Sequence, residues 1–275
     1  MKKLLIFLAV AMGFSTPLGA SDPSGTSALR SLMTGDDSRG WEAVGRLNMS
    51  GESFCTGAMI ADNLVLTAGH CLFDKETGRR YEPGEIEFLA GWRNGRASAY
   101  RGVRRAIVHP DFDFSGINKT TRVAHDLALL ELDQPIRTTS VTPFETDVRP
   151  RKGAEVGVVS YAHDRSESPA LQEMCHVLAR QSGTLVLSCD VDYGSSGAPI
   201  FVYENGKARI VSVVSAKAFV RDVPVSLGTS LERPLADLMA ILEESDGVFT
   251  RVTPTAQRIT PQGKRSNGGA KFLRP

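Results

Sequence analysis

Beyond Trp41, short apolar runs rich in β-branched residues alternate with clusters of Gly, Asn, Asp and Pro. Runs of this kind, bounded by turn-forming residues, are typical of strands in β-sandwiches and β-barrels. The pattern therefore predicts an all-β fold, with its strands in two series. The first series is Ala43–Met49, Phe54–Ile60, Asn63–Leu66, Ile86–Ala90, Gly102–Val108 and Leu127–Leu132; the second is Glu155–Tyr161, Cys175–Leu178, Thr184–Ser188, Pro199–Val202, Arg209–Val214 and Val225–Leu231.

One long helix is predicted near the end of this region. After Pro234, the residues Leu235, Leu238, Met239 and Leu242 recur at the spacing i, i+3, i+4 and i+7. That spacing places them on one face of a helix. We expect this C-terminal helix to dock on the second series of strands.

The first twenty residues have the composition of a secretory signal. Lys2 and Lys3 precede an apolar run from Leu4 to Val10, and small residues lead to a cleavage site after Ala20. The apolar run is too short to span a membrane as a helix. An uncleaved anchor is the alternative interpretation. We expect a protein that is secreted or periplasmic, with no membrane association once the signal is removed.

The rest of the chain divides by composition into three parts. Residues 21–40 are small and polar without a core-facing period, which suggests a linker or a pro-segment. Residues 41–245 hold both series of strands and the helix, with a division near residues 140–153. Residues 246–275 carry six Lys or Arg against one Asp and no core-forming pattern, as in a disordered basic tail. A contact of this tail with an acidic surface is the alternative.

The overall charge and the cysteines limit the kinds of partner and site. The formal net charge is +1, which favours no charged partner such as nucleic acid. Four cysteines in an exported chain allow three disulfide pairings. Pairing of neighbours, Cys55 with Cys71 and Cys175 with Cys189, is favoured because each pair spans a short strand-like segment. The second pair flanks residues 180–183, whose sequence suggests a hairpin turn between two strands. Without Cys-x-x-Cys and with scattered histidines, neither a metal nor a cofactor is expected.

The segment from Asp190 to Pro199 holds the strongest chemical signal. Its serines lie among glycines, in a sequence that suits a tight turn with N–H groups directed at a substrate. Ser196 is favoured over Ser195 as the nucleophile because Gly197 follows it directly and Gly194 precedes it by two. The N–H groups of Gly194 and Ser196 could then stabilise an oxyanion.

A histidine and an aspartate occur upstream of this serine, in the order that a relayed nucleophile needs. His70 follows an apolar run and two small residues, which leaves room for a substrate beside an imidazole able to take and return a proton. Asp126 opens the strand-like run from Leu127 to Leu132. A carboxylate entering a buried strand needs hydrogen-bond donors, and the ring N–H of His70 would be one.

These motifs together resemble those of the chymotrypsin-like, trypsin-fold serine proteases of the secreted bacterial kind. The likeness covers about residues 41–243. It implies two perpendicular antiparallel β-barrels with an active site between them. It also implies His70 as base, Asp126 as its orienting carboxylate and Ser196 as nucleophile, and Cys55–Cys71 matches the family's histidine-loop disulfide. The matching segments are Gly45–Leu47, Phe54–Gly57, Leu66–Cys71, Val108–Pro110, Asp126–Leu130 and Gly194–Pro199.

One departure from the family concerns activation. Trypsin and its animal relatives carry an aspartate directly before the nucleophile, which a newly cut amino terminus neutralises. This chain has Ser195 there, and no Ile-Val-Gly-Gly-like segment precedes Trp41. We therefore expect activity that does not depend on an ion pair made by a new amino terminus.

The residues expected to bind substrate give a mixed indication of specificity. Asp190, six residues before Ser196, occupies the position of the trypsin pocket carboxylate, and Gly228 a pocket-lining position. Both suggest cleavage after Arg or Lys. Ser215 belongs to the strand that would hold the substrate backbone. On the same strand Lys217 replaces a glycine, so it could narrow the pocket or pair with Asp190. Val214 replaces the histidine of the related glutamyl endopeptidases, which argues against acidic specificity.

The sequence thus predicts a secreted, monomeric serine endopeptidase that hydrolyses protein or peptide substrates through an acyl-enzyme, with Arg or Lys before the cleaved bond. The main alternative is a protease-fold binding or scaffolding module without useful catalysis. An esterase of another fold would need Gly-x-Ser-x-Gly within an α/β pattern, and the sequence has neither.

Overall fold

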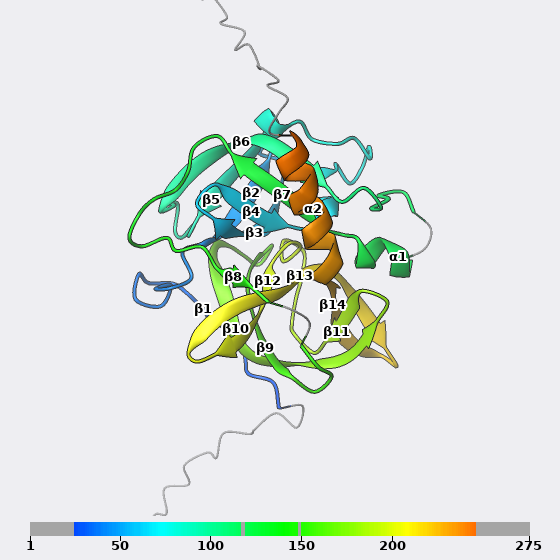
Figure 1. Ribbon diagram of the computed structural model, residues 1–275. Coiled ribbons are helices and arrows are strands. Elements are labelled where there is room, and N and C mark those ends of the chain that lie inside the picture. Colours follow the sequence, from blue (N-terminus) through cyan, green and yellow to red (C-terminus); the bar gives the residue numbers. More distant parts are fainter. Residues whose placement is uncertain (1–24, 117–118, 148–149, 246–275) are drawn as a thin grey trace, which may run out of the picture.

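The computed structural model describes residues 25–116, 119–147 and 150–245 and consists mainly of β-strands in two lobes (Figure 1). The predicted signal at residues 1–20 and the predicted basic tail at residues 246–275 lie outside the described residues. The prediction of an all-β class with one C-terminal helix is confirmed. Among the described residues, no helix has both the length and the apolar character needed to cross a membrane.

The first lobe is a closed six-stranded barrel with the strand order β2-β3-β4-β7-β6-β5. Every pairing in it is antiparallel, and its interior is filled by apolar side chains such as Leu47, Met59, Leu66, Phe88 and Leu129, all of which are fully buried. The strands are β2 (Val44–Met49), β3 (Ser53–Ala61), β4 (Leu64–Thr67), β5 (Ile86–Ala90), β6 (Ala99–Val108) and β7 (Ala128–Leu132).

The second lobe is built on a path of strands, β10-β11-β14-β13-β12-β9, which the additional pairing of β9 with β10 closes on itself. Two short strands, β1 and β8, add to it from outside this ring. The strands are β1 (Arg30–Ser31), β8 (Glu145–Thr146), β9 (Glu155–Ala162), β10 (Arg165–Gln181), β11 (Thr184–Leu187), β12 (Pro199–Glu204), β13 (Lys207–Val220) and β14 (Val223–Ser230).

Strand β10 is longer than its hydrophobic pattern suggested, because Cys175–Leu178 is only part of a 17-residue strand. Its pairing register shifts three times, which is typical of a strand that bends. Its first part pairs with β9, and with β1 at Ala170 and Leu171, and its last part pairs with β11. It ends in the expected hairpin turn, where Ser182 (φ 44°) and Gly183 (φ 82°) adopt left-handed conformations.

The segment expected to be a linker or pro-segment is part of the fold in its described portion. Strand β1 pairs with β10, and Leu32 is fully buried in the main hydrophobic core. The interpretation of this segment as small and polar, without a core-facing period, thus did not reveal its one buried leucine. A single buried leucine between short polar stretches has no periodicity that a sequence pattern could reveal.

Helix α2 (Glu232–Ser245) is where the prediction placed a helix, but it docks elsewhere. It lies along the first barrel and contacts β6, rather than covering the second lobe (Figure 1). Leu238 is fully buried, Leu235, Met239 and Leu242 pack beside it, and Asp237 approaches His109. Amphipathic periodicity gives a helix an apolar face but does not indicate which surface that face covers.

Three short helical segments complete the fold: the 3₁₀ helices η1 (Gly69–Leu72) and η2 (Pro83–Glu85), and α1 (Lys119–Ala124). The two lobes are joined by contacts of β3 with β9 and β12. An aromatic cluster of Trp41, Phe144 and Phe201, with ring centroids 4.8–6.0 Å apart, lies in the core that they share.

Candidate active site

His70 and Asp126 are brought together between the ends of first-barrel strands. Strand β4 leads into η1, which carries His70, and Asp126 lies two residues before β7. The Nδ1 atom of His70 is 2.7 Å from Asp126 Oδ2, and the backbone N–H of His70 donates to Asp126 Oδ1 at 2.7 Å. The carboxylate therefore holds both the ring and the backbone of the histidine.

The Asp126 carboxylate is only 2% exposed, so its charge must be compensated by hydrogen bonds. A third donor supplements the two from His70, because Ser215 Oγ–H donates to Asp126 Oδ2 at 2.5 Å. The sequence placed Ser215 with the substrate backbone, whereas its side chain contacts the carboxylate. Ser215 comes from β13, so the second lobe helps to hold a pair that belongs to the first.

The small residues before His70 have a packing reason. A Cβ atom on Gly69 would lie 3.3 Å from Asp126 Oδ1 and from the backbone of Leu127, so a side chain there would push against the carboxylate. The disulfide Cys55–Cys71, with its Cα atoms 6.2 Å apart, joins η1 to β3 directly beside His70. Together these features limit the positions open to the imidazole.

Ser196 lies on the turn between β11 and β12, where the second lobe meets β3. Its carbonyl oxygen accepts a hydrogen bond from Thr56 N–H at 2.8 Å, and Gly197 N–H donates to Val214 O at 2.8 Å. A Cβ atom on Gly197 would collide with Thr56 O and Thr67 Oγ1, beside the start of η1. Ser196 is half-buried, and its hydroxyl forms no hydrogen bond with another described residue.

The N–H groups of this turn divide into two sets. Within the described part of the chain, those of Gly194 and Ser196 have no acceptor, and these are the two that the sequence assigned to an oxyanion hole. Gly194 has φ +95°, a conformation that favours glycine. The satisfied N–H groups donate from Ser195 to Asp192 O, from Gly197 to Val214 O and from Ala198 to Ser195 O.

Two residues that the sequence analysis did not assign to the site hold this turn. Buried Thr56 donates its hydroxyl to Gly194 O at 2.9 Å and accepts from Tyr161 N–H at 3.1 Å. Arg165 donates to the Ser195 hydroxyl at 3.4 Å. Thr56 lies inside the Cys55-Thr56-Gly57 motif, so its neighbourhood could have been noticed. No sequence signal indicated Arg165.

The residues assigned to specificity make contacts that the sequence did not indicate. Lys217 lies 3.8 Å from Asp192, rather than pairing with Asp190. The Asp190 side chain is exposed and makes no ion pair with a described residue, while its backbone N–H donates to Gln172 Oε1 at 2.8 Å. Gly228 has a packing role, because a Cβ atom there would collide with Ser212 Oγ.

The cysteines form two disulfides, Cys55–Cys71 and Cys175–Cys189, and none is free. Cys55, His70 and Cys71 lie close enough together to suggest a metal site among the described residues. The sulfur atoms of Cys55 and Cys71 are bonded to each other, so these residues offer no thiolate to a metal.

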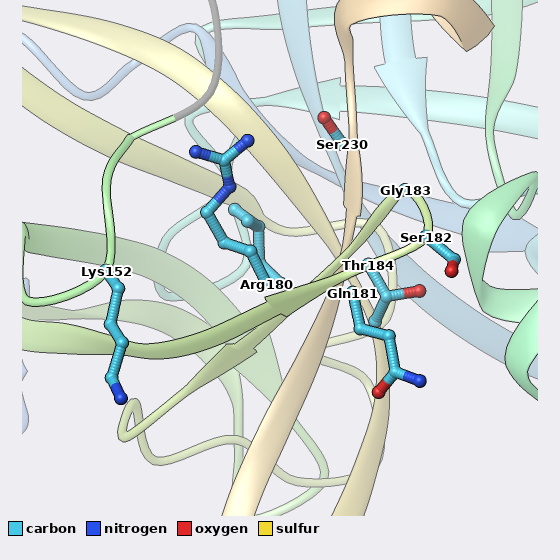
Figure 2. Close-up of a pocket in the computed structure, with 8 residues that line it drawn as sticks. Lys152, Arg180, Gln181, Ser182, Gly183, Thr184 and Ser230 are labelled. Carbon is cyan, nitrogen blue, oxygen red and sulfur yellow. The ribbon is translucent and has the colours of Figure 1, made fainter.

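A pocket of about 300 Å³ lies at the turn between β10 and β11 (Figure 2). Its cationic side chains, Lys152 and Arg180, extend in different directions. Thr184 and Ser230 also line it, and none of the residues predicted to act on a substrate does. It therefore offers no convergent set of groups to compete with the site around His70.

Comparison with known proteins identifies relatives of this chain. Guinea pig (Cavia porcellus) coagulation factor IX is 35% identical over 110 residues, which are 38% of this chain and 33% of that protein. Two mouse (Mus musculus) proteins, kallikrein 1-related peptidase-like b4 and kallikrein-1, are 33% and 32% identical over 146 and 149 residues. These matches cover 50% and 51% of this chain, and 50% and 52% of those proteins. The chain thus spans about half the length, or less, of these relatives.

A solved structure of a Glu endopeptidase, in complex with MPD, has the same fold. It superposes with a TM-score of 0.60 at 18% identity, and the match covers 74% of this chain and 92% of that one. The fold is that of the chymotrypsin-like serine proteases. The model of the family described as Trypsin matches residues 34–220, more than half of the chain. The chain belongs to the trypsin family.

Proposed function

We propose that the protein is a secreted, monomeric serine endopeptidase that cleaves protein or peptide substrates. The observation that carries this proposal is the joint arrangement of His70, Asp126 and the Ser196 turn. A buried carboxylate holds the imidazole. The turn presents one hydroxyl and two N–H groups that form no hydrogen bond with any described residue. In a turn with a structural role alone, we would expect both N–H groups to have an acceptor, because buried backbone N–H groups are nearly always paired.

In the proposed reaction, Ser196 Oγ attacks the peptide carbonyl carbon while its proton passes to His70 Nε2. The negative oxygen that forms is stabilised by the N–H groups of Gly194 and Ser196. His70 then gives the proton to the leaving amine, and water releases the acyl group by the same route. Asp126 remains ionised and holds the imidazole. These steps use no metal or cofactor.

The export proposal rests on the predicted signal at residues 1–20 and on the two disulfides, which persist in oxidising compartments. We propose that the mature protein begins after Ala20 and is secreted or periplasmic. We also propose residues 41–245 as the protease domain, with the segment from Gly25 to Gly40 as a part of its folded body rather than a detachable linker.

For the residue before the cleaved bond, we propose Arg or Lys, recognised by Asp190. Lys217 is engaged by Asp192, which leaves the Asp190 carboxylate without a cation among the described side chains. The segment from Asp190 onward leads directly into the Ser196 turn, so a carboxylate there is placed to attract a cationic side chain of the substrate.

Hydrolysis of a matched set of peptides, with Arg, Lys, Glu or Leu before the scissile bond, tests both parts of the proposal. We expect cleavage after Arg and Lys by the full-length protein. His70→Ala should lose at least about a thousandfold in kcat. Asp190→Asn should lose about 100-fold in kcat/KM for Arg and Lys peptides alone. Asp222→Asn, at the exposed β13–β14 turn, is the matched control.

Cleavage that is equally fast after all four residues, or unaffected by Asp190→Asn, would contradict the specificity and leave the endopeptidase assignment intact. A folded protein that cleaves none of the peptides, nor an unfolded protein substrate, would contradict the assignment itself. That result would favour a protease-fold binding module.

A further inference from the structure

The Ser196 turn is supported from beneath by an arginine that belongs to none of the recognised motifs. Arg165 begins strand β10, and its side chain is only 13% exposed. Its Nη2 group donates to Ser195 Oγ at 3.4 Å and to Ser160 Oγ at 3.2 Å. Its Nη1 group lies 3.1 Å from the carboxylate of Asp164, a side chain that is 74% exposed.

The Ser195 side chain is fully buried, and its hydroxyl is surrounded by hydrogen-bond partners. It accepts from Arg165 and from Asp192 N–H, at 3.4 and 3.3 Å. A hydroxyl accepts at two lone pairs and donates one proton, so its own proton must go to β9. Two acceptors lie within reach there, Tyr161 O at 3.2 Å and Ser160 Oγ at 3.3 Å.

The same end of the β9–β10 hairpin also holds the turn by its backbone. His163 N–H donates to Tyr193 O at 2.7 Å, on the other side of Gly194 from Ser195. Gly194 is thus held between two attachments to one hairpin, while Thr56 of the first barrel holds its carbonyl oxygen. These contacts set the direction of the Gly194 and Ser196 N–H groups.

The position of Arg165 is costly, which argues that the arginine does more than fill space. A largely buried guanidinium loses hydration, and its Nε–H has no partner among the described residues. Its only carboxylate within 4.0 Å in that part of the chain is mostly exposed. An apolar side chain could occupy this volume without that cost.

We propose that Arg165 is a positioning residue for the oxyanion-binding N–H groups and acts through the Ser195 hydroxyl. It holds the turn in the conformation that directs the Gly194 and Ser196 N–H groups at the substrate. It does so through contacts with Ser195 and Ser160, without an ion pair from a new amino terminus. The inference rests on the proposed function, because those two N–H groups have a role in the transition state only in such a reaction.

Kinetics of single and double variants test this role in the full-length protein. Arg165→Gln should lower kcat by about 10- to 100-fold, because the N–H groups act on the transition state, and leave KM within about twofold. Ser195→Ala should lower kcat similarly. Because both act through one contact, the double variant should be no slower than the slower single variant. Arg165→Lys should recover part of kcat.

Binding of a peptide aldehyde gives a second readout that lost stability alone would not change. The aldehyde forms a tetrahedral adduct that needs the oxyanion site, whereas the matching product peptide does not. Arg165→Gln should weaken aldehyde binding by the factor lost in kcat and leave product binding unchanged. Arg209→Gln is the control, because it removes ion pairs outside the turn, with Glu145 (2.6 Å), Asp147 (3.8 Å) and Glu204 (4.0 Å).

The outcomes separate this inference from the proposed function. Hydrolysis by the wild type with an unchanged kcat in Arg165→Gln would overturn the positioning role alone, as would losses that multiply in the double variant. A wild type that hydrolyses nothing would overturn both. If Arg165→Gln does not fold, Arg165→Lys and Ser195→Ala provide the same comparison.

Discussion

The Asp126 carboxylate shows how individual side chains define this site. It is buried, yet it has three donors: the ring and backbone N–H groups of His70 and the hydroxyl of Ser215. Hydrogen bonds to a charged group contribute about 1.5–3 kcal/mol each, so the burial of the charge is largely compensated. Because the donors come from both lobes, the orientation of His70 depends on how the lobes meet.

Removal of the Ser215 hydroxyl should therefore reduce catalysis more than stability. For Ser215→Ala we expect kcat to fall by about tenfold, with KM nearly unchanged, because one of the three donors to Asp126 is lost. Steady-state kinetics on an Arg peptide measures this.

Ser212→Ala is the matched control, because Ser212 is also a buried serine of β13. Its hydroxyl donates to Thr229 O, not to Asp126. It should change stability alone. Equal kcat values for the two variants and the wild type would contradict the role assigned to Ser215.

Residues that belong to a short sequence motif could be identified from the sequence. Residues whose role depends on contacts with residues far away in the sequence could not. The structure brings His70 and Asp126 together as the motifs suggested, and the N–H groups of Gly194 and Ser196 have no acceptor among the residues that it describes. The roles of these residues stay predictions. Thr56 and Arg165 were missed because their partners in the turn are distant in the sequence. Gly194 and Tyr161 lie at least 105 residues from Thr56, and Ser195 lies 30 residues from Arg165.

At the level of elements, helix α2 contacts a pair of stacked histidines, His109 and His125, on the first barrel. His109, which follows β6, is 2% exposed, and its ring stacks on His125 with centroids 4.9 Å apart. His109 Nε2 lies 3.4 Å from Asp237 of α2, and its Nδ1 accepts from Asp111 N–H. Burial lowers the pKa of His109 below its ordinary value of 6.5, although Asp237 and Asp111 oppose that shift and His125 adds to it.

This shift predicts a loss of stability in acid. In the folded protein His109 binds a proton only at lower pH, so near pH 6.5 and below the unfolded chain binds more protons. The free energy of unfolding should therefore fall as the pH drops through 6.5, with a slope of up to about 1.4 kcal/mol per pH unit from this group. Urea unfolding at several pH values measures the slope.

His109→Gln should remove that part of the slope between pH 7.5 and 5.5. His163→Gln is the control, because His163 is exposed. A slope that is the same in the wild type and in both variants would contradict the assignment to His109.

The element-level predictions failed where tertiary contacts decide the outcome. The helix was expected at the right residues, but its apolar face covers β6. The segment before Trp41 was interpreted as a linker or a pro-segment, and in the structure β1 pairs with β10 and Leu32 is buried. The hairpin at Ser182 and Gly183, whose signal is local, was predicted from the sequence.

At the level of the whole molecule, the candidate site draws on both β-lobes, which meet where β2 and β3 contact β9 and where β3 contacts β12. The first lobe supplies His70 and Asp126, and the second supplies Ser196, Ser215 and the support of the turn. The amino-terminal segment also reaches this region, since Gln172 accepts from Asp190 N–H and donates to Ser27 O at 2.8 Å. Residues far apart in the sequence therefore set the geometry of a site that short motifs only outlined.

The central claim is that Ser196 is a nucleophile activated by His70. The most direct test is labelling of the folded protein with a fluorophosphonate, followed by mass mapping of the modified peptide. We predict one phosphonyl group on Ser196 in the wild type and in the control Ser188→Ala, and none in Ser196→Ala or His70→Ala. A folded wild type that stays unlabelled, or is labelled on another residue such as Ser195, would contradict the account.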